Sequence, residues 1–439
     1  MSFSKYVKYK ESGIAWLGSV PSDWGIAPIK AVASCNDEVL PESTDSESVI
    51  EYVEISGVEE GRGITETETL AFGAAPSRAR RVVRHGDVLI STVRTYLRAI
   101  ATVTNPPENL VASTGFAAIR PRSVDAGFLG YLLHAEYLMS EVIARSVGIS
   151  YPAINASELM RLKAPIPSLQ EQRAISAFLD SEAAKIDALV EEQKRLIELL
   201  KEKRQAVISQ AVTRGLNPNV PMKDSGVPWL GEIPAHWQIQ RGRFLFGQSY
   251  DPPEDGDGVV TAFRDGQVTL RENRRTDGFT VAVMEVGYQH VRVGDLVIHG
   301  MDAFAGAIGV SESDGKCTPE YSVLRPRMAG LSNHYYAAAL RLMALRNFIY
   351  VICPSVRERA PRFRYESFKD VWLPVPPANE QAEIMGHVSA EVRRLNELAR
   401  EAESLISLAT ERRSGLISAA VTGKIDVRGL VQVQPKAVA

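Results

Sequence analysis

Residues 170–213 read QEQRAISAFLDSEAAKIDALVEEQKRLIELLKEKRQAVISQAVT, and residues 380–422 repeat the same pattern at an offset of 209 positions. Apolar residues recur in both stretches at alternating spacings of four and three, which predicts a long helix with one apolar seam. At 1.5 Å per residue, such a helix extends roughly 65 Å. Because a single seam on so long a helix needs a partner, we expect the two copies to pair with each other.

The expected seam is the coiled-coil core of both helices. Its predicted members are Ile175, Leu179, Ile186, Leu189, Leu196, Leu200 and Val207 in the first copy, and Ile384, Val388, Leu395, Leu398, Leu405 and Leu416 in the second. The outer faces of the helices either dock partners or are simply solvated, and the sequence does not separate these two. Two unrelated surface helices are the alternative, but the shared spacing argues against them.

Size and composition indicate a folded, non-membrane chain. It has 439 residues, of which 45% are hydrophobic and 23% charged, enough for two or three domains. We find no apolar run of about 20 residues and no signal peptide. Three distant cysteines (Cys35, Cys317 and Cys353) offer neither a disulfide framework nor a C-x-x-C metal site. We therefore expect a cytoplasmic protein.

Charge is distributed very unevenly along the chain. Residues 37–68 hold eleven acidic residues and one basic residue, whereas residues 76–98 hold six arginines and one acidic residue. Runs of arginine interleaved with aromatic residues favour contact with DNA phosphates and base edges. Pairing of these arginines with the acidic stretch is the structural alternative.

The predicted DNA contacts fall in both halves of the chain. They are Arg78, Arg80, Arg81, Arg94, Tyr96, Arg98, Ser113, Thr114, Tyr151 and Asn155 in the first half, and Arg264, Arg271, Arg274, Arg275, His299, Asp302, Arg357, Arg359, Arg362 and Arg364 in the second. Arg120 and Arg325 precede prolines in both halves, so we expect them to be structural.

The whole chain is a duplication. KESGIAWLGSVPSDW (residues 10–24) returns as KDSGVPWLGEIPAHW (223–237), and VRHGDVLI (83–90) returns as VRVGDLVI (291–298). Gly-Asp before a β-branched run predicts a turn into a buried strand. Equal spacing of Trp16 and Trp24 with Trp229 and Trp237 favours a packing role. Each repeat is thus expected to be a mixed α/β domain followed by a long helix.

Two stretches barely match between the repeats. Residues 33–79 differ from 247–286, and residues 91–111 differ from 299–318. Unlike inserts on a common frame predict two domains that read different targets, with drift of surface loops as the alternative. Held apart by a rigid spacer, such domains suit two DNA half-sites about one helical turn, roughly 34–36 Å, apart. We therefore expect a bipartite, asymmetric site with an unread spacer.

The order of these motifs, given twice over nearly the whole chain, resembles the specificity subunit of Type I restriction–modification systems. The resemblance implies an α+β fold: two tandem target-recognition domains, each followed by a long helix, with the helices packed as an antiparallel coiled coil. The expected boundaries are 1–169 for the first domain, 170–214 for its helix, 215–378 for the second domain, 379–425 for its helix and 426–439 for a tail.

The same resemblance implies partners and a division of labour. Double-stranded DNA, two modification (methyltransferase) subunits and restriction/translocase subunits are the expected partners. S-adenosylmethionine, ATP and Mg²⁺ belong on those subunits, and we expect no cofactor and no metal in this chain. The second repeat departs from the pattern: Pro319-Glu320 replaces Thr114-Gly115, and His299 replaces Ser91.

No catalytic constellation is found in the sequence. The adenine methyltransferase motif Asn/Asp-Pro-Pro-aromatic has two near misses, Asn105-Pro-Pro-Glu108 and Asp251-Pro-Pro-Glu254, whose glutamates cannot stack on a base. We interpret both as turns and expect His85 to be structural or phosphate-facing, not catalytic. A non-catalytic DNA-recognition subunit is the favoured function. A duplicated scaffold that binds proteins is the alternative, and an enzyme fused to its own reader lacks any supporting motif.

Overall fold

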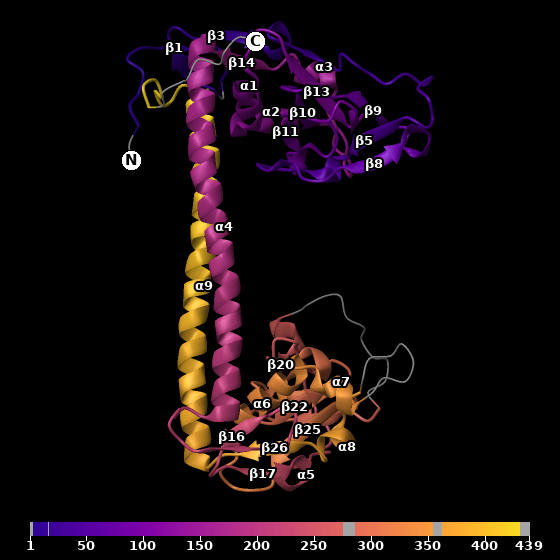
Figure 1. Cartoon of the computed structure of the whole chain (residues 1–439), viewed down its shortest axis with the longest axis vertical. Helices are drawn as coiled ribbons and strands as arrows, with labels where there is room; N and C mark the ends of the chain where they lie inside the picture. Colours follow the sequence, from indigo (N-terminus) through magenta and orange to yellow (C-terminus); the bar gives the residue numbers. More distant parts are fainter. Residues whose placement is uncertain (1–2, 16, 275–285, 354–361, 431–439) are drawn as a thin grey trace. The chain divides into compact units, whose positions relative to one another are not determined.

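The computed structural model describes residues 3–430, apart from residues 16, 275–285 and 354–361. The chain divides into two compact units. The first unit is Met1–Gln193 with Glu403–Ala439, and the second unit is Lys194–Ala402. The two long helices that the sequence predicts are α4 (Leu169–Arg214) and α9 (Ala378–Val421), and each contributes to both units (Figure 1). None of the helices in the described part of the chain has the length and apolarity that a membrane crossing needs.

The first unit contains strands and helices in mixed order. Its strands are β1 (Tyr9–Glu11), β2 (Ser19–Pro21), β3 (Gly25–Pro28), β4 (Ala33–Cys35), β5 (Val49–Val53), β6 (Val58–Glu59), β7 (Gly63–Ile64), β8 (Glu68–Ala71), β9 (Ala79–Val82), β10 (Val88–Ser91), β11 (Ile100–Thr102), β12 (Leu110–Ser113), β13 (Phe116–Pro121) and β14 (Lys163–Ile166). Its shorter helices are α1 (Ala126–His134), α2 (Glu136–Arg145) and α3 (Ala156–Leu159).

The second unit follows a similar order. Its strands are β15 (Met222–Asp224), β16 (Glu232–Pro234), β17 (Gln238–Arg241), β18 (Phe246–Gln248), β19 (Val260–Ala262), β20 (Val268–Leu270), β21 (Gln289–Val291), β22 (Leu296–His299), β23 (Ile308–Val310), β24 (Gly315–Cys317), β25 (Tyr321–Pro326) and β26 (Trp372–Val375). Its shorter helices are α5 (Gly242–Leu245), α6 (Asn333–Leu345), α7 (Phe348–Ile352) and α8 (Tyr365–Phe368).

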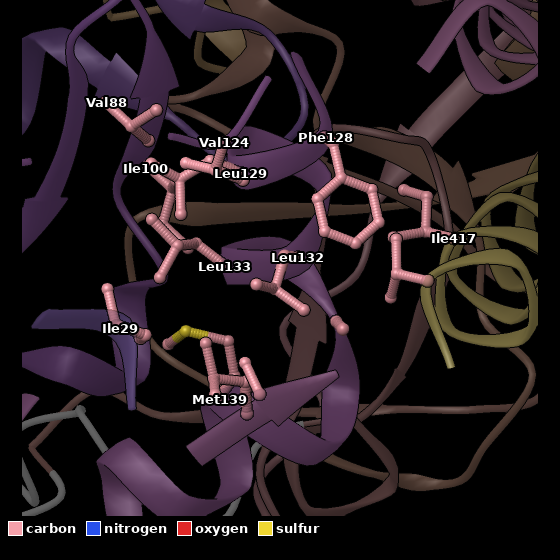
Figure 2. Close-up of a cluster of buried hydrophobic side chains, with 14 of the residues drawn as sticks. Ile29, Val88, Ile100, Val124, Phe128, Leu129, Leu132, Leu133, Met139 and Ile417 are labelled. Carbon is pink, nitrogen blue, oxygen red and sulfur yellow. The ribbon is translucent and has the colours of Figure 1, made fainter. Parts of the chain in front are cut away.

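An antiparallel sheet in the order β11-β10-β13-β4 forms the centre of the first unit. Side chains alternate between its faces. Val88 and Ile90 of β10 pack with α1 and α2, whereas Leu89 faces a second cluster formed with the insert strands. Figure 2 shows this first cluster, where Phe128 of α1 lies near Ile417 of α9. The long helix α9 therefore completes the core of the first unit.

The second unit repeats this sheet in the order β18-β25-β22-β23, with the same pairing directions. The inserts around the sheets differ. The first unit has a four-stranded sheet, β8-β5-β12-β9, whose β5 and β12 are parallel. The second unit has the pairs β19-β20 and β21-β24 in its place. The poorly matched stretches of the two repeats thus coincide with different local topologies.

The Gly-Asp turn before each central strand is fixed by an arginine. Gly86 has φ +84°, and the buried Asp87 that follows accepts hydrogen bonds from Nε and Nη2 of Arg120 at 2.8 and 2.9 Å. Asp295 and Arg325 make the same two bonds in the second unit. Such a pairing satisfies a carboxylate that is otherwise costly to bury. The structural role expected for Arg120 and Arg325 is confirmed.

A buried glutamine attaches the start of each long helix to its domain. Gln172 donates through Nε2 to the Pro167 carbonyl and accepts from the Asp125 amide through Oε1, at 2.9 and 2.7 Å. Gln381 makes the equivalent bonds to Pro376 and Ser332, both at 2.9 Å. The Glu-Gln pair that recurs in the sequence is therefore a joint between helix and domain.

Glycine ends each long helix against a tryptophan. Gly423 (φ +70°) follows α9 and packs on Pro21 and Trp24 of the first unit, where an added Cβ would collide with the proline. Gly215 (φ +71°) follows α4 and packs on Trp237 of the second unit. Left-handed glycine is the common helix terminator. The predicted packing role holds for the buried Trp24, Trp229 and Trp237, whereas Trp16 lies outside the described residues.

The apolar seam of the long helices differs from the prediction at four positions. Leu189, Leu196, Leu398 and Leu405 are between 40% and 47% exposed. At each of these four points the buried or half-buried residue is the next one in the chain, namely Val190, Ile197, Ala399 or Ile406. The buried or half-buried positions of the seam are Ile175, Leu179, Ala183, Ile186, Val190, Gln193, Ile197, Leu200, Arg204 and Val207 on α4, and Ile384, Val388, Val392, Leu395, Ala399, Ala402, Ile406, Ala409, Arg413 and Leu416 on α9.

The corrected seam makes a prediction with two chemically identical substitutions. Leu200 is buried on α4, whereas Leu196, one turn earlier, is exposed. Leu200→Ala is expected to lower the free energy of unfolding by about 2–4 kcal/mol, because it leaves a cavity. Leu196→Ala should cost less than about 1 kcal/mol. Chemical denaturation of both variants measures the difference, and equal losses would contradict the corrected seam.

A second prediction concerns acid stability. The pKa of Glu38 is lowered to about 2 by hydrogen bonds from Arg84 and then Arg120. A depressed pKa in the folded state gives stability above the unfolded pKa of about 4.3 that is lost as pH falls toward 2. Glu38→Gln should therefore cost on the order of 1 kcal/mol at neutral pH, since water screens this half-exposed carboxylate, and the difference should vanish near pH 2.

Hydrogen exchange of the β4 and β13 amides, compared between parent and variant across this pH range, measures the effect locally. Glu42→Gln is the control, because Glu42 is exposed and the described residues show no cation bound to it. A difference between parent and Glu38→Gln that stays constant from pH 7 to pH 2 would count against the ion pair.

Candidate nucleic-acid interface

A strained segment follows the central strand of the first unit. Residues 92–98 contain the 3-10 turn Thr95–Leu97, which is bounded by Arg94 and Arg98 at φ +52° and +49°. Left-handed backbone at a non-glycine residue costs of order 1 kcal/mol or more and clusters at functional sites. Two such arginines on either side of one turn make this segment a candidate contact site.

Backbone hydrogen bonds join this segment to three others. The Thr92 amide donates to the Gly115 carbonyl at 2.8 Å, and the Ile154 amide donates to the Thr92 carbonyl at 2.9 Å. The Thr114 amide donates to the Arg78 carbonyl at 2.8 Å. Residues 76–81, 92–98, 113–115 and 147–155 therefore form one connected surface, which we call the first loop surface.

All ten contacts predicted for the first domain lie on the first loop surface. Arg78, Arg94, Tyr96, Thr114, Tyr151 and Asn155 are exposed, while Arg80, Arg81 and Arg98 are half-buried. Ser113 is a correction. Its side chain is buried and its hydroxyl accepts from the Gly115 amide at 3.3 Å, so it shapes the turn and is not available to a ligand.

Part of the arginine charge is neutralised by the acidic stretch. Arg78 contacts Glu54 at 2.6 Å, and Arg98 contacts Glu136 at 2.6 Å and Glu60 at 3.5 Å. A hydrogen bond with Tyr52 and the Glu54 charge raise the pKa of Arg78. The structural alternative considered for these arginines therefore applies to Arg78 and Arg98.

Three arginines of the first loop surface carry unbalanced charge. Among the described residues, Arg80, Arg81 and Arg94 have no carboxylate within ion-pair distance. The Arg80 guanidinium lies over the Phe72 ring and that of Arg94 over the Tyr151 ring, at 4.9 and 4.5 Å. Stacking on an aromatic ring holds a guanidinium in place without neutralising it. Such groups suit an anionic ligand.

The second unit repeats the backbone connections of this surface. The Gly300 amide donates to the Glu320 carbonyl and the Phe363 amide to the Gly300 carbonyl, both at 2.8 Å. Its charges are arranged differently. Arg264 pairs with Asp302 at 2.9 Å, Arg274 with Asp265 at 2.7 Å, and Glu320 accepts from Arg364 at 2.8 Å. The acids Asp302 and Glu320 therefore lie among the arginines of this unit.

The other contacts predicted for the second domain vary in accessibility. Arg362 lies 3.6 Å from Glu320, and Arg271 donates to Thr261 at 3.4 Å. His299 is mostly buried against Tyr321, and burial lowers its pKa, which favours the neutral ring. Arg275, Arg357 and Arg359 lie outside the described residues.

Sequence reasoning missed three exposed apolar side chains on the first loop surface. Leu97, Val147 and Ile149 are exposed, next to the predicted Tyr96 and Tyr151. Val147 and Ile149 lie in a loop with Gly148 and Ser150, which gave a weak signal of exposure. The general expectation that apolar residues lie inside hid it.

The two methyltransferase near misses have structural roles. Asn105 has φ +48° and its amide donates to His85 Nδ1 at 3.0 Å, while the Leu110 amide closes a turn onto Pro107. Asp251 binds Arg325 and Arg292 at 2.7 and 2.9 Å. The described residues also contain no group of three histidine, cysteine or acidic side chains suited to a metal.

Comparison with known proteins finds sequence similarity over part of the chain. The Type I restriction modification DNA specificity domain matches residues 21–199. The Type I restriction enzyme MjaVIII specificity subunit of Methanocaldococcus jannaschii is 24% identical over 216 residues, covering 48% of this chain and 49% of the relative. The chain thus spans about half the length of this curated relative.

Solved structures share the fold over most of the chain. The HsdS subunit of Thermoanaerobacter tengcongensis aligns with a TM-score of 0.57 at 20% identity, covering 92% of this chain and 98% of that one. A chain from a structure of complex assembly and conformational transition in the type I R-M system aligns with a TM-score of 0.66 at 21% identity, covering 94% and 99%. The chain is thus similar in sequence to the Type I restriction modification DNA specificity domain over residues 21–199, and similar in fold to these solved chains over most of its length.

Proposed function

We propose that this chain is the DNA-reading subunit of a Type I restriction–modification complex and recognises a split, asymmetric site. The observation that carries the proposal is the set of unneutralised arginines, Arg80, Arg81 and Arg94, on one connected surface. Arginine contacts phosphates and reads guanine edges through its paired N–H groups. Different inserts on a common frame support two unlike half-sites.

The two long helices are proposed to pair as an antiparallel coiled coil that spaces the domains. In the first unit Arg413 binds Asp187 at 2.6 Å, and in the second unit Arg204 approaches Asn396 at 3.4 Å. From 187 to 204 the pairing moves 17 residues forward on α4, and from 413 to 396 it moves 17 residues backward on α9. Opposite directions at equal steps support an antiparallel alignment.

Partners are proposed from the family. Two modification subunits bind along the helices and methylate adenine, and restriction subunits join them. S-adenosylmethionine, ATP and Mg²⁺ are carried by those subunits, and this chain is proposed to be non-catalytic and cytoplasmic. A protein-binding scaffold remains the competing function. A scaffold of this kind would bind DNA weakly, and its DNA affinity would not fall steeply with salt. A steep fall arises from the counterions that phosphate contacts release.

Phosphate contact by the first loop surface is tested with single substitutions. Arg80→Ala and Arg94→Ala should each reduce the slope of log affinity against log salt by about 1. The loss of affinity between 50 and 200 mM salt then shrinks by about threefold per variant. Fluorescence anisotropy with duplex DNA, using the chain assembled with its modification subunits, measures both quantities.

Arg122→Ala is the matched control for this experiment. Arg122 is exposed and paired with Asp37 at 2.6 Å, and it follows β13 at the end opposite the 113–115 turn. Its salt slope should equal that of the parent. Weaker binding by the Arg80 and Arg94 variants with an unchanged slope would argue against phosphate contact.

Genome-wide mapping of N6-methyladenine tests the split site itself. A host expressing this chain with its modification subunit should show one bipartite motif with two unlike halves, absent from a host without the chain. Exchange of residues 10–164 for those of another family member should change one half only, since each domain reads one half. Methylation that persists unchanged without the chain would sink the specificity role.

A further inference from the structure

A short loop of the first unit exposes apolar side chains to an unusual degree. Val147 and Ala153 exchange two backbone hydrogen bonds at 2.9 and 3.0 Å, which closes residues 147–153 into a tight loop. Between these anchors, Ile149 is 102% exposed and Tyr151 60%, and Val147 itself is 80% exposed. We call residues 147–153 the apolar loop.

The apolar loop is firmly attached to the strained segment beside it. The Arg94 amide donates to the Pro152 carbonyl at 2.8 Å, and Val93 forms a bridge with Ala153. The hydroxyls of Thr95 and Ser146 lie 2.8 Å apart. These three contacts hold the base of the loop against the strained segment, and the tip of the loop projects from it.

Chemistry around the loop indicates what covers it. Exposure of β-branched apolar side chains to water is unfavourable. A cluster of such side chains on a surface therefore marks a contact site. The Arg94 guanidinium stacks on Tyr151 at 4.5 Å and has no carboxylate partner among the described residues. Tyr96 and Leu97 extend the exposed apolar area. DNA matches this surface in two ways: its stacked bases can contact the apolar side chains, and its phosphates can pair with the unbalanced positive charge.

We propose that the apolar loop is a wedge, in which Ile149 enters between two adjacent base pairs while Arg94 binds the flanking phosphate. This inference rests on the proposed DNA-reading function and adds a way of reading. Apolar wedges unstack a base step and kink the duplex. The energy of that distortion depends on the step, being lowest for pyrimidine–purine steps such as TA and CA. Ile149 thus contributes specificity through deformability, without a hydrogen bond to any base.

The experiment uses duplexes that contain the methylation motif, with 2-aminopurine placed in turn at each purine of the half read by the first domain, other than the methylated adenine. The chain is assembled with its modification subunits and no S-adenosylmethionine is added. Unstacking should raise fluorescence severalfold at one step. Ile149→Ser should abolish the rise and weaken binding about tenfold, as expected for loss of one buried isoleucine. Ile149→Leu should retain it.

Val7→Ser is the control, because Val7 is 93% exposed in the same unit but lies outside the first loop surface. It should behave as the parent. Tight, salt-dependent binding without a fluorescence rise at any step would overturn the wedge while leaving the DNA-reading function intact. Absence of DNA binding by the parent would instead overturn that function. Loss of modification-subunit binding by Ile149→Ser, with DNA binding unchanged, would assign the loop to a protein contact and also overturn the wedge.

Discussion

The joint between each domain and its long helix depends on one buried glutamine. Gln172 and Gln381 each satisfy a carbonyl in the Pro-x-Pro entry and an amide at the start of the first helix after the central sheet. Loss of either side chain leaves two buried backbone groups without partners, at a cost of about 1–3 kcal/mol each. These hydrogen bonds fix the direction in which the helix leaves its own domain. They thereby also fix which surface of the domain lies beside the helix.

The two repeats share this frame, but their loop surfaces differ in charge. The first loop surface keeps free positive charge on Arg80, Arg81 and Arg94; aromatic rings hold Arg80 and Arg94, and Arg80 also donates to a backbone carbonyl. The second unit places Asp302 and Glu320 among its arginines. Carboxylates accept from the exocyclic amines of cytosine and adenine, whereas free arginines favour guanine and phosphate. Under the proposed DNA-reading function, the two repeats would therefore differ in recognition chemistry while keeping the same central sheet.

Duplication made much of this structure predictable from sequence. The buried tryptophans, the Gly-Asp turn and the long helices recur in the same order, at offsets of 213, 208 and 209 positions, so that chance similarity is excluded. The prediction was wrong where the burial of a side chain did not follow from its residue type. On the helix seam, Val190 and Ile197 are more buried than Leu189 and Leu196, the neighbouring leucines that were predicted instead. The Ser113 side chain is buried in its own turn, whereas the Ile149 side chain is exposed. Hydrophobic periodicity does not predict whether a loop side chain is buried or exposed.

The packing of Ile417 and Val421 into the core of the first unit has a consequence for synthesis. Residue 193, the last of its N-terminal part, precedes Val421 by 228 residues. At about 5–20 residues per second, the ribosome adds those residues in roughly 11–46 s. During this interval the first domain lacks the helix that completes its core, with Phe128 and Leu132 incompletely covered. The first domain is therefore synthesised first, but its core is completed only after the second domain has been made. During this interval it is more accessible to proteases and chaperones.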